Sequence, residues 1–386
     1  MGFRAERALI SEGDPVRWVV ISDDWQIHAE ASTYLDSLRA ADRSLNTERI
    51  YAGRVALFLS WCAESGVDWR KPTFLQLHEY LRWLAVTPFA IRKSTGAARV
   101  RSRSTANAAF TAASEFLRFG AVQGWVPTEV PAMLTTREHL RFVPSDFPAG
   151  EEGQFRSVAV RSIKFRVSRA TPEALTPQQV DQVMSAVAHA RDRLLVLLMV
   201  TAGLRIGEAL GLARQDMHLL GRSDMLGCPL PGPHLHVVRR VNENGALAKS
   251  RYPRTIPVTD PVIDAYADYQ FERERLALEA SSESVFVNLF RPPLGRAMRY
   301  STVKDLFDRL AERCGFAVRP HMLRHTAATR WLEAGVAPDV VQALLGHVSF
   351  ASTSVYLHAS RERMREAVEM TAAHGRSNGA ASRTIS

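Results

Sequence analysis

Residues 194–212 read LLVLLMVTAGLRIGEALGL, and this stretch decides how the C-terminal half of the chain folds. Its apolar part, Leu194 to Leu204, has eleven residues. A membrane span needs about 20, so the run predicts a buried core helix. Arg205 and Glu208 follow a glycine-containing break and share a face if they are helical. We expect Glu208 to hold the Arg205 guanidinium while its outer edge faces a phosphate; the alternative is a surface ion pair, worth about 0–1 kcal/mol.

Around this stretch the residue pattern predicts a mainly α fold in two domains. Apolar residues recur at helical spacing from about residue 25 to 140. Short β-prone runs at His234–Val241, Thr255–Val258 and 285–287 predict a small antiparallel β-sheet in the C-terminal domain. The predicted parts are an irregular lead-in over residues 1–22, a helical domain over 23–140, a basic interdomain linker over 141–172, a mixed α+β domain over 173–373 and a disordered tail over 374–386.

Composition favours a soluble protein with an anionic partner. The chain has 386 residues, of which 46% are hydrophobic and 23% charged, as in ordinary globular proteins. Lys and Arg number 49 against 40 Asp and Glu, a net charge of +9. An excess of this size favours nucleic acid ahead of an anionic membrane surface, the alternative being a solvated basic surface.

Cysteine usage and the first residues favour a reducing, cytoplasmic setting. Cys62, Cys228 and Cys314 lie far apart without C-x-x-C spacing, so neither a disulfide scaffold nor a cysteine-rich zinc site is expected. Residues 1–14 carry charges throughout and lack the apolar core of a signal peptide. We therefore expect a cytoplasmic protein, associated with the nucleoid if it binds DNA.

Basic residues concentrate in two stretches outside the conspicuous motifs. Each stretch lies among Ser, Thr, Gly or Pro, and arginine pairs bidentately with phosphate oxygens. Solvated loops are the plainer alternative. The candidate DNA contacts are Arg92, Lys93, Arg99, Arg101 and Arg103 in the first stretch, and Arg161, Lys164 and Arg166 in the second.

Four further candidate motifs follow Arg205, and each is weak alone. Lys249 lies near a predicted β-turn, where most lysines are merely solvated. Pro320 predicts a helix start, on which His321 and Arg324 share a face. His321 and His325 have the spacing of a zinc peptidase helix, but Met322 replaces the glutamate that such a site needs, so no metal is expected. Gly346 is expected to end a helix and expose the next residue, His347. Tyr356 lies between apolar neighbours and alone would be taken for a core residue.

Taken together, these residues resemble the tyrosine recombinases, also called the phage integrase family. The string Thr201 to Glu208 is similar to the family's T-G-L-R-x-x-E, and His321 to His325 to its H-x-L-R-H. Leu-Gly-His stands nine residues before the tyrosine, and Lys249 stands eight before Pro257, as in the K…R-x-[IV]-P hairpin. The positions that match in order and approximate spacing are Arg205, Lys249, His321, Arg324, His347 and Tyr356.

The resemblance implies DNA strand cleavage through a 3′-phosphotyrosine. Tyr356 would be the nucleophile and His321 its proton acceptor, while Lys249 would protonate the departing 5′-oxygen. Arg205, Arg324 and His347 would stabilise the charge on the phosphate, and Glu208 would orient Arg205. The helical domain would be the family's core-binding domain, and residues 173–373 its catalytic domain.

The implied partners are double-stranded DNA and three further copies of the chain, which would form a homotetramer on DNA. No cofactor, metal, ATP or membrane is expected, and integrase, transposon recombinase and dimer resolvase remain open. A type IB topoisomerase, and a DNA-binding protein without catalysis, are the competing functions. The loop over residues 220–233 departs from the compact family pattern and has no assigned role.

Overall fold

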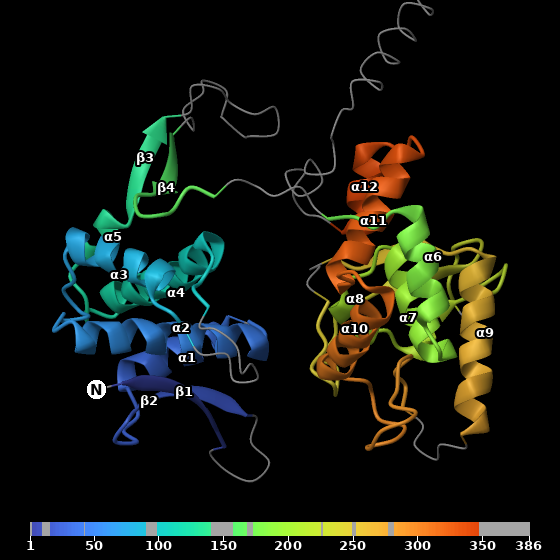
Figure 1. Cartoon of the computed structure of the whole chain (residues 1–386), viewed down its shortest axis with the longest axis horizontal. Helices are drawn as coiled ribbons and strands as arrows, with labels where there is room; N and C mark the ends of the chain where they lie inside the picture. The colour runs from blue at the N-terminus through green and yellow to red at the C-terminus, as the bar shows by residue number, and fades with distance from the viewer. Residues whose placement is uncertain are drawn as a thin grey trace, which may run out of the picture. The chain divides into compact units, whose positions relative to one another are not determined.

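The computed structural model describes residues 2–9, 16–41, 43–89, 99–139, 157–167, 173–224, 227–248, 252–276 and 282–346. The chain divides into two compact units, Met1–Arg169 and Ala170–Ser386, called unit 1 and unit 2 below. Helices dominate both units, and small antiparallel sheets accompany them (Figure 1). The predicted fold class, mainly α with a small antiparallel sheet in the C-terminal half, is confirmed.

Among its described residues, unit 1 has five helices. Hydroxyl side chains begin three of them: Ser44, Thr73 and Ser102 each accept a hydrogen bond from a backbone N–H of the first turn. The apolar stripes meet in one core, in which aromatic side chains such as Phe58 and Phe116 are fully buried. The helices are α1 (Ala29–Ala40), α2 (Leu45–Glu64), α3 (Phe74–Val86), α4 (Arg103–Val122) and α5 (Glu129–Met133).

The prediction of an irregular lead-in over residues 1–22 is wrong. Strands β1 (Phe3–Ala8) and β2 (Arg17–Ser22) form an antiparallel hairpin. A two-stranded hairpin is marginal alone, and this one packs on α2. The Phe3 N–H donates to Ser60 Oγ (2.7 Å) and the Trp18 N–H to Glu48 Oε1 (2.7 Å), while Val20 is fully buried. Tertiary contacts therefore stabilise a segment with a weak local signal.

The predicted linker over residues 141–172 also needs correction. Strand β4 (Ser157–Arg161) pairs antiparallel with β3 (Thr135–His139). Beyond β4, Ile163 is buried, and the Asn107 side chain both donates to and accepts from the Phe165 backbone (2.9 and 2.8 Å). Residues 157–167 thus belong to unit 1; residues 140–156 and 168–172 lie outside the described part of the chain.

Unit 2 combines helices with a three-stranded antiparallel sheet of order β5-β6-β7. Its third strand is β5, not the predicted run at 285–287, which makes only isolated bridges. The predicted helix start at Thr176 is confirmed by a complete capping box with Gln179. The elements are α6 (Pro177–Ala186), α7 (Ala190–Thr201), α8 (Ile206–Leu210), the 3₁₀ turn η1 (Arg214–Asp216), β5 (Met217–His218), β6 (His234–Val237), β7 (Arg254–Pro257), α9 (Asp260–Arg275), α10 (Tyr300–Cys314), α11 (Pro320–Glu333) and α12 (Pro338–Leu345).

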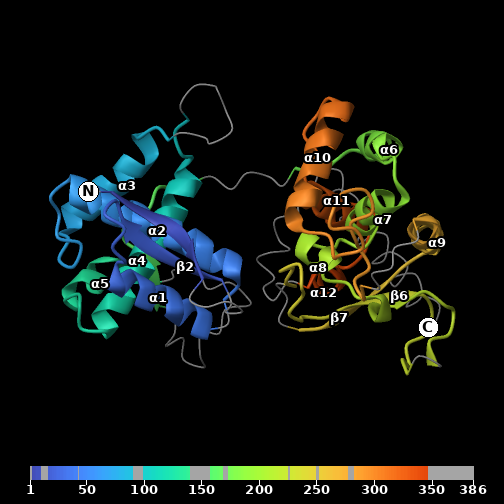
Figure 2. The same ribbon diagram turned by 90° about the horizontal axis from the view of Figure 1, so that it is seen from below.

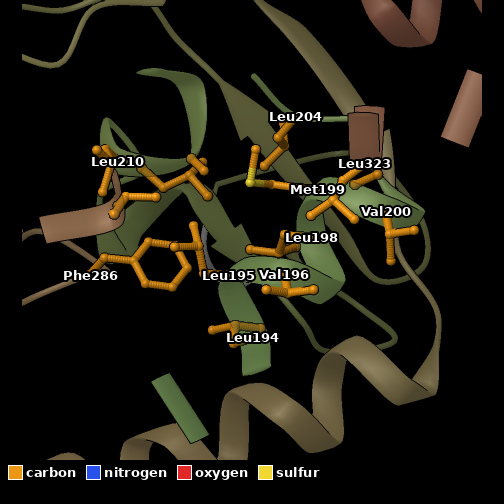
Figure 3. Packing of buried hydrophobic residues seen from close by; sticks show 14 of the residues in the cluster. Leu194, Leu195, Val196, Leu198, Met199, Val200, Leu204, Leu210, Phe286 and Leu323 are labelled. Carbon is orange, nitrogen blue, oxygen red and sulfur yellow. The ribbon is translucent and has the colours of Figure 1, made fainter. Parts of the chain in front are cut away.

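Helix α7 is the central element of the unit 2 core, as its composition predicts. Leu194, Leu195 and Leu198 are fully buried, and they cluster with Phe286 (Figure 3). Burial on several sides explains why the helix lacks an amphipathic pattern. In the described residues no helix combines the length and apolarity that a membrane crossing requires.

Candidate active site

The turn between α7 and α8 places Arg205 and requires glycine at residue 203. Gly203 has a φ of 61°, in the left-handed region. A Cβ there would also lie 3.0 Å from Trp331 and 3.1 Å from Leu345. Arg205 follows as the N-cap residue of α8. Close packing and backbone conformation together therefore fix the start of α8.

Glu208 holds Arg205 as the sequence predicts. Glu208 accepts from the Arg205 backbone N–H (2.9 Å) and from Arg205 Nη1 (2.8 Å). The Glu208 side chain is 0% exposed and that of Arg205 is 20% exposed. The alternative of a surface ion pair is therefore wrong. The guanidinium is fixed on one side by a buried carboxylate and remains partly accessible on the other.

A second arginine, Arg254 on β7, binds the same carboxylate. The sequence analysis assigned no role to Arg254. Arg254 Nη2 and Nη1 donate to the two Glu208 oxygens at 2.7 and 3.2 Å. Its Nε donates to the Leu344 carbonyl oxygen (2.9 Å). The one sequence signal was its place in the string Arg254-Thr-Ile-Pro257, where it is the arginine of the R-x-I-P pattern.

Arg324 on α11 completes the cluster. Its Nη1 donates to the Gly203 carbonyl oxygen (2.5 Å) and lies 3.7 Å from Glu208 Oε2. Its Nη2 donates to the Leu345 carbonyl oxygen (2.6 Å), which also accepts from Arg205 Nη1 (3.4 Å). The Arg205 and Arg324 guanidinium groups therefore converge on one oxygen atom. Arg205 is the more accessible, because the Arg324 side chain is only 3% exposed.

The C-terminal end of α12 anchors all three arginines. The last carbonyl groups of a helix lack intrahelical partners and carry the negative end of its dipole. Leu344 and Leu345 supply those carbonyls here. Gly346 ends the helix, as predicted, with a φ of 62°. A Cβ on Gly346 would lie 2.9 Å from Arg254 Nη1, so the arginine approaches the backbone closely.

We expect Gly346→Ala to disturb the cluster and Gly335→Ala to leave it intact. Both glycines have positive φ, so each alanine costs about 1–2 kcal/mol of backbone strain. Only at residue 346 does the added methyl also meet an arginine; nothing lies within 4 Å at residue 335. Both variants should lose stability in urea unfolding, and Gly346→Ala should lose about 1–3 kcal/mol more, because only its methyl group displaces the Arg254 guanidinium. Equal losses of stability in the two variants would contradict this role of Gly346.

Three guanidinium groups around one carboxylate leave the cluster positively charged. Burial by itself would raise the pKa of Glu208. The hydrogen bonds and charge of Arg254, together with the charge and backbone N–H of Arg205, outweigh burial and lower that pKa to about 2. Glu208 is therefore ionised at neutral pH, and the excess positive charge is available to an anion such as a DNA phosphate.

His321 and His325 lie on the first turns of α11, which begins at Pro320 as predicted. His321 is exposed, and its ring centroid lies 6.4 Å from that of the half-buried His325. Burial, and then the neighbouring His321 and Arg324, lower the pKa of His325. In the described part of the chain, no acidic or cysteine side chain joins the two rings in a group of possible metal ligands.

Several predicted residues cannot be placed in this cluster. Residues 249, 347 and 356 lie outside the described part of the chain, as do 92 and 93. The roles of Lys249, His347 and Tyr356 therefore stay predictions. In the sequence, Lys249 lies between β6 and β7, and His347 follows Leu345 and Gly346.

In unit 1 the two predicted basic stretches meet beside α4. We call Arg54, Arg103 and Arg161 the α4 face. Arg161 Nη1 donates to Thr111 Oγ1 (2.6 Å), and Arg103 lies over the Phe165 ring at 5.8 Å. Arg54 and Arg161 line one shallow hollow with Ser104, Asn107 and Thr111. Lys164 and Arg166 are also exposed and lie in the same segment as Arg161, residues 157–167.

The first basic stretch divides at α4. Arg101 is half-buried, and its guanidinium carbon lies 4.9 Å from the centroid of the Phe89 ring, on which it packs. Burial lowers the pKa of Arg101. Arg99 is exposed, and its backbone forms a bridge with Phe89. Arg103, at the first turn of α4, is exposed as well. Arg99 and Arg103 are thus better placed than Arg101 to meet a phosphate.

The chain is similar in sequence to known integrases, transposases and recombinases. A family profile described as "Phage integrase family" matches residues 173–363. Transposase A from transposon Tn554 of Staphylococcus aureus is 26% identical over 352 residues, covering 90% of this chain and 92% of that protein. Tyrosine recombinase XerC of Chlamydia pneumoniae is 32% identical over 202 residues, covering 50% of this chain and 57% of that protein.

The fold is also that of a solved DNA complex. The structure of the Tn1549 transposon integrase in complex with a circular intermediate DNA matches with a TM-score of 0.57 at 17% sequence identity. The match covers 89% of this chain and 99% of that chain. At this level of identity the likeness establishes the shared fold, and the chemistry must be argued from the residues of the present chain.

Proposed function

Since the chain belongs to the phage integrase family, the tyrosine recombinases, we propose that it is a site-specific recombinase that cleaves and rejoins DNA through a 3′-phosphotyrosine. The observation that carries the proposal is the convergence of Arg205 and Arg324 on the Leu345 carbonyl, with Glu208 holding Arg205. The transposase relative matches over nearly the whole of both chains, which supports integration, excision or transposition of a DNA element as the role.

The arginine cluster would act on the phosphate under attack. Attack on a phosphodiester adds negative charge to the non-bridging oxygens, and fixed positive groups stabilise that charge more than mobile water does. Arg205 and Arg324 would donate to these oxygens, with His347 as a further donor. Because Glu208 and the α12 carbonyls already hold the guanidinium groups, little reorganisation is required during the reaction.

The bond changes would involve Tyr356, His321 and Lys249. The Tyr356 oxygen would form a bond to phosphorus while the bond from phosphorus to the 5′-oxygen breaks. His321, exposed on α11, would take the phenol proton, and Lys249 would give a proton to the departing oxygen. A phosphotyrosine is a phosphodiester like the bond it replaces, so rejoining needs no ATP. The chemical step requires no metal ion.

A nicked duplex tests the proposal. The DNA site can be selected from a random library by binding to the Tyr356→Phe variant. With a nick in the same strand a few nucleotides 3′ of the scissile phosphate, cleavage frees a short fragment with the 5′-hydroxyl, and its loss traps the covalent complex. Wild-type protein should give a protein–DNA adduct on a denaturing gel without ATP, and Tyr356→Phe should give none. Binding without any Tyr356-dependent adduct would leave only a DNA-binding role, and site-independent relaxation of plasmid would favour a topoisomerase.

The α4 face is the proposed DNA contact of unit 1. Each of Arg103→Ala and Arg161→Ala should weaken binding of the selected duplex and lower the slope of log affinity against log salt by roughly 1, because each removes about one phosphate contact. Arg70→Ala is the matched control, since Arg70 is bonded to Glu30 and is not part of the α4 face. Fluorescence anisotropy over a salt series measures both quantities. Unchanged slopes in both variants would place the DNA elsewhere.

The proposed assembly is a homotetramer on two duplexes. The number of cleavages supports this assembly. Exchange of strands between two duplexes needs four cleavages, and each chain carries one candidate nucleophile. Sedimentation of the Tyr356→Phe variant with the selected duplex should show four chains with two duplexes. A complex that remains at one chain per duplex under recombination conditions would contradict the tetramer.

A further inference from the structure

Four side chains that could bind a metal meet on the sheet of unit 2, apart from the arginine cluster. They are His218 on β5, Cys228 in the β5–β6 connection, and His234 and His236 on β6. One possible ligand atom from each lies within 4.8 Å of the others. His218, Cys228 and His234 are buried, and His236 is half-buried. We propose that these four residues form a zinc site.

The strand register explains why the three histidines share one place. Residues two apart on a strand point to the same face of a sheet, which puts His234 and His236 together. β5 pairs antiparallel with β6 so that His218 lies directly opposite His234. The three ring centroids are 4.7 to 5.0 Å apart. Figure 2 shows β6 next to β7 at the edge of unit 2.

Hydrogen bonds fix the ring nitrogens that remain for a metal. His234 Nδ1 lies 2.7 Å from the Gly232 carbonyl oxygen, and His218 Nε2 lies 3.1 Å from that of Gln215. A carbonyl oxygen only accepts, so these two nitrogens must carry the protons. The lone pairs of His234 Nε2 and His218 Nδ1 are then available. Metal-binding histidines commonly donate their other N–H to a carbonyl in this way.

One of these lone pairs is buried without a partner. His218 Nδ1 is inaccessible to water and makes no hydrogen bond. Leaving a buried polar atom unsatisfied is unfavourable. Coordination of a metal by this nitrogen would remove that cost. The atom therefore points to a ligand independently of the grouping of the four residues.

The distances to the thiol fit tetrahedral zinc. Cys228 Sγ lies 3.3 Å from His234 Nε2 and 3.6 Å from His236 Nε2. With zinc–sulfur and zinc–nitrogen bonds of about 2.3 and 2.0–2.1 Å, a tetrahedral angle separates sulfur from nitrogen by about 3.5 Å. One thiolate and three imidazoles are borderline-soft ligands that suit zinc rather than magnesium or calcium. Four protein ligands complete the tetrahedron, so the site is structural, not catalytic.

The site gives the long β5–β6 connection a role. The described residues of this connection, 219–224 and 227–233, include Cys228, whose thiol lies 3.3 Å from His234 Nε2 on β6. Zinc would fasten this connection to the sheet, whose third strand, β7, carries Arg254. The proposed zinc site departs from the sequence prediction, which expected no metal. That prediction relied on cysteine spacing, whereas three of these ligands are histidines brought together by strand pairing.

Metal content of the full-length protein tests the proposal. Protein purified without chelator, or reconstituted with zinc, should hold about one zinc per chain by mass spectrometry. Cys228→Ser and His236→Asn should each weaken zinc binding more than about tenfold. Cys314→Ser and His189→Gln are the matched controls, because they change a cysteine and a histidine outside the site. Neither control should change the stoichiometry.

Cobalt(II) gives a readout that is independent of DNA cleavage. Wild-type protein should show the intense visible bands of tetrahedral cobalt and a thiolate charge-transfer band, and Cys228→Ser should lose the latter. If Cys228→Ser does not fold, as judged by circular dichroism, the cobalt spectrum of His236→Asn tests the site instead, because His236 is only half-buried. Wild-type protein that binds neither zinc nor cobalt, or a cobalt spectrum unchanged by these substitutions, would overturn the site. Because the recombination chemistry uses no metal, either result leaves the proposed function untouched.

Discussion

Arg205→Lys should lower the single-turnover rate of DNA cleavage by a factor of about 10²–10³, the usual effect of removing a donor that stabilises transition-state charge. Lysine keeps the positive charge, but it lacks the planar fork that lets arginine bond a carboxylate and a phosphate together. Arg205 uses Nη1 for Glu208, so a lysine ammonium would have to choose between Glu208 and the DNA. The rate is measured on the nicked duplex at saturating protein.

A matched control separates this effect from a general loss of arginine. Arg313 also lies in unit 2 and donates to a backbone carbonyl, that of Ala186, away from the cluster. Arg313→Lys should cleave within about twofold of wild type, since surface substitutions rarely matter. Binding of the duplex should change little in either variant. Wild-type cleavage by Arg205→Lys would remove Arg205 from the chemistry.

Glu208→Gln should destabilise the folded protein by about 3–5 kcal/mol at pH 7. Removing one partner from a buried ion pair leaves the other charges uncompensated. Here the amide would leave Arg254 and Arg205 without their buried carboxylate, at a side chain that is 0% exposed. Urea unfolding measures the loss. Glu243→Gln is the control, because Glu243 is about half exposed and lies 3.8 Å from Arg296, so it should cost less than about 1 kcal/mol.

The stabilities of wild type and Glu208→Gln should respond differently to acid. The pKa of Glu208 is about 2 in the folded chain, below its ordinary value of 4.5. A lowered carboxyl pKa contributes stability that is complete above the unfolded value and lost as the pH falls toward the folded one. Wild type should therefore lose about 3 kcal/mol of its advantage over Glu208→Gln between about pH 5 and pH 2. A difference independent of pH would show that the carboxylate charge is not what stabilises the cluster.

Local patterns predicted much of the site. Arg205 and Glu208 are three residues apart, Pro320 stands at a helix start and Gly346 at a helix end, and the structure has each contact or boundary where these patterns place it. Such features depend on backbone geometry within one or two turns. Nearby residues in the sequence therefore sufficed to predict them.

Contacts between distant segments could not be predicted in the same way. Arg254 and Glu208 are separated by 46 positions, and nothing in either local sequence fixes their meeting. The hairpin of β1 and β2 gains its stability from α2, and residues 157–167 from α4. The four possible zinc ligands share a face only because β5 and β6 pair in one register. Each of these features depends on tertiary packing, which residue spacing does not specify.

If Arg205 acts on the charge of the phosphate under attack, its contribution should depend on that charge, and a neutral phosphate removes it. A methylphosphonate at the cleavage position replaces one non-bridging oxygen with a methyl group and removes the negative charge. On the ordinary duplex, Arg205→Ala should cleave about 10²–10³-fold more slowly than wild type. On the methylphosphonate duplex, that penalty should shrink to less than about tenfold, because there is less charge to stabilise. An equal penalty on both duplexes would show that Arg205 does not act on this charge.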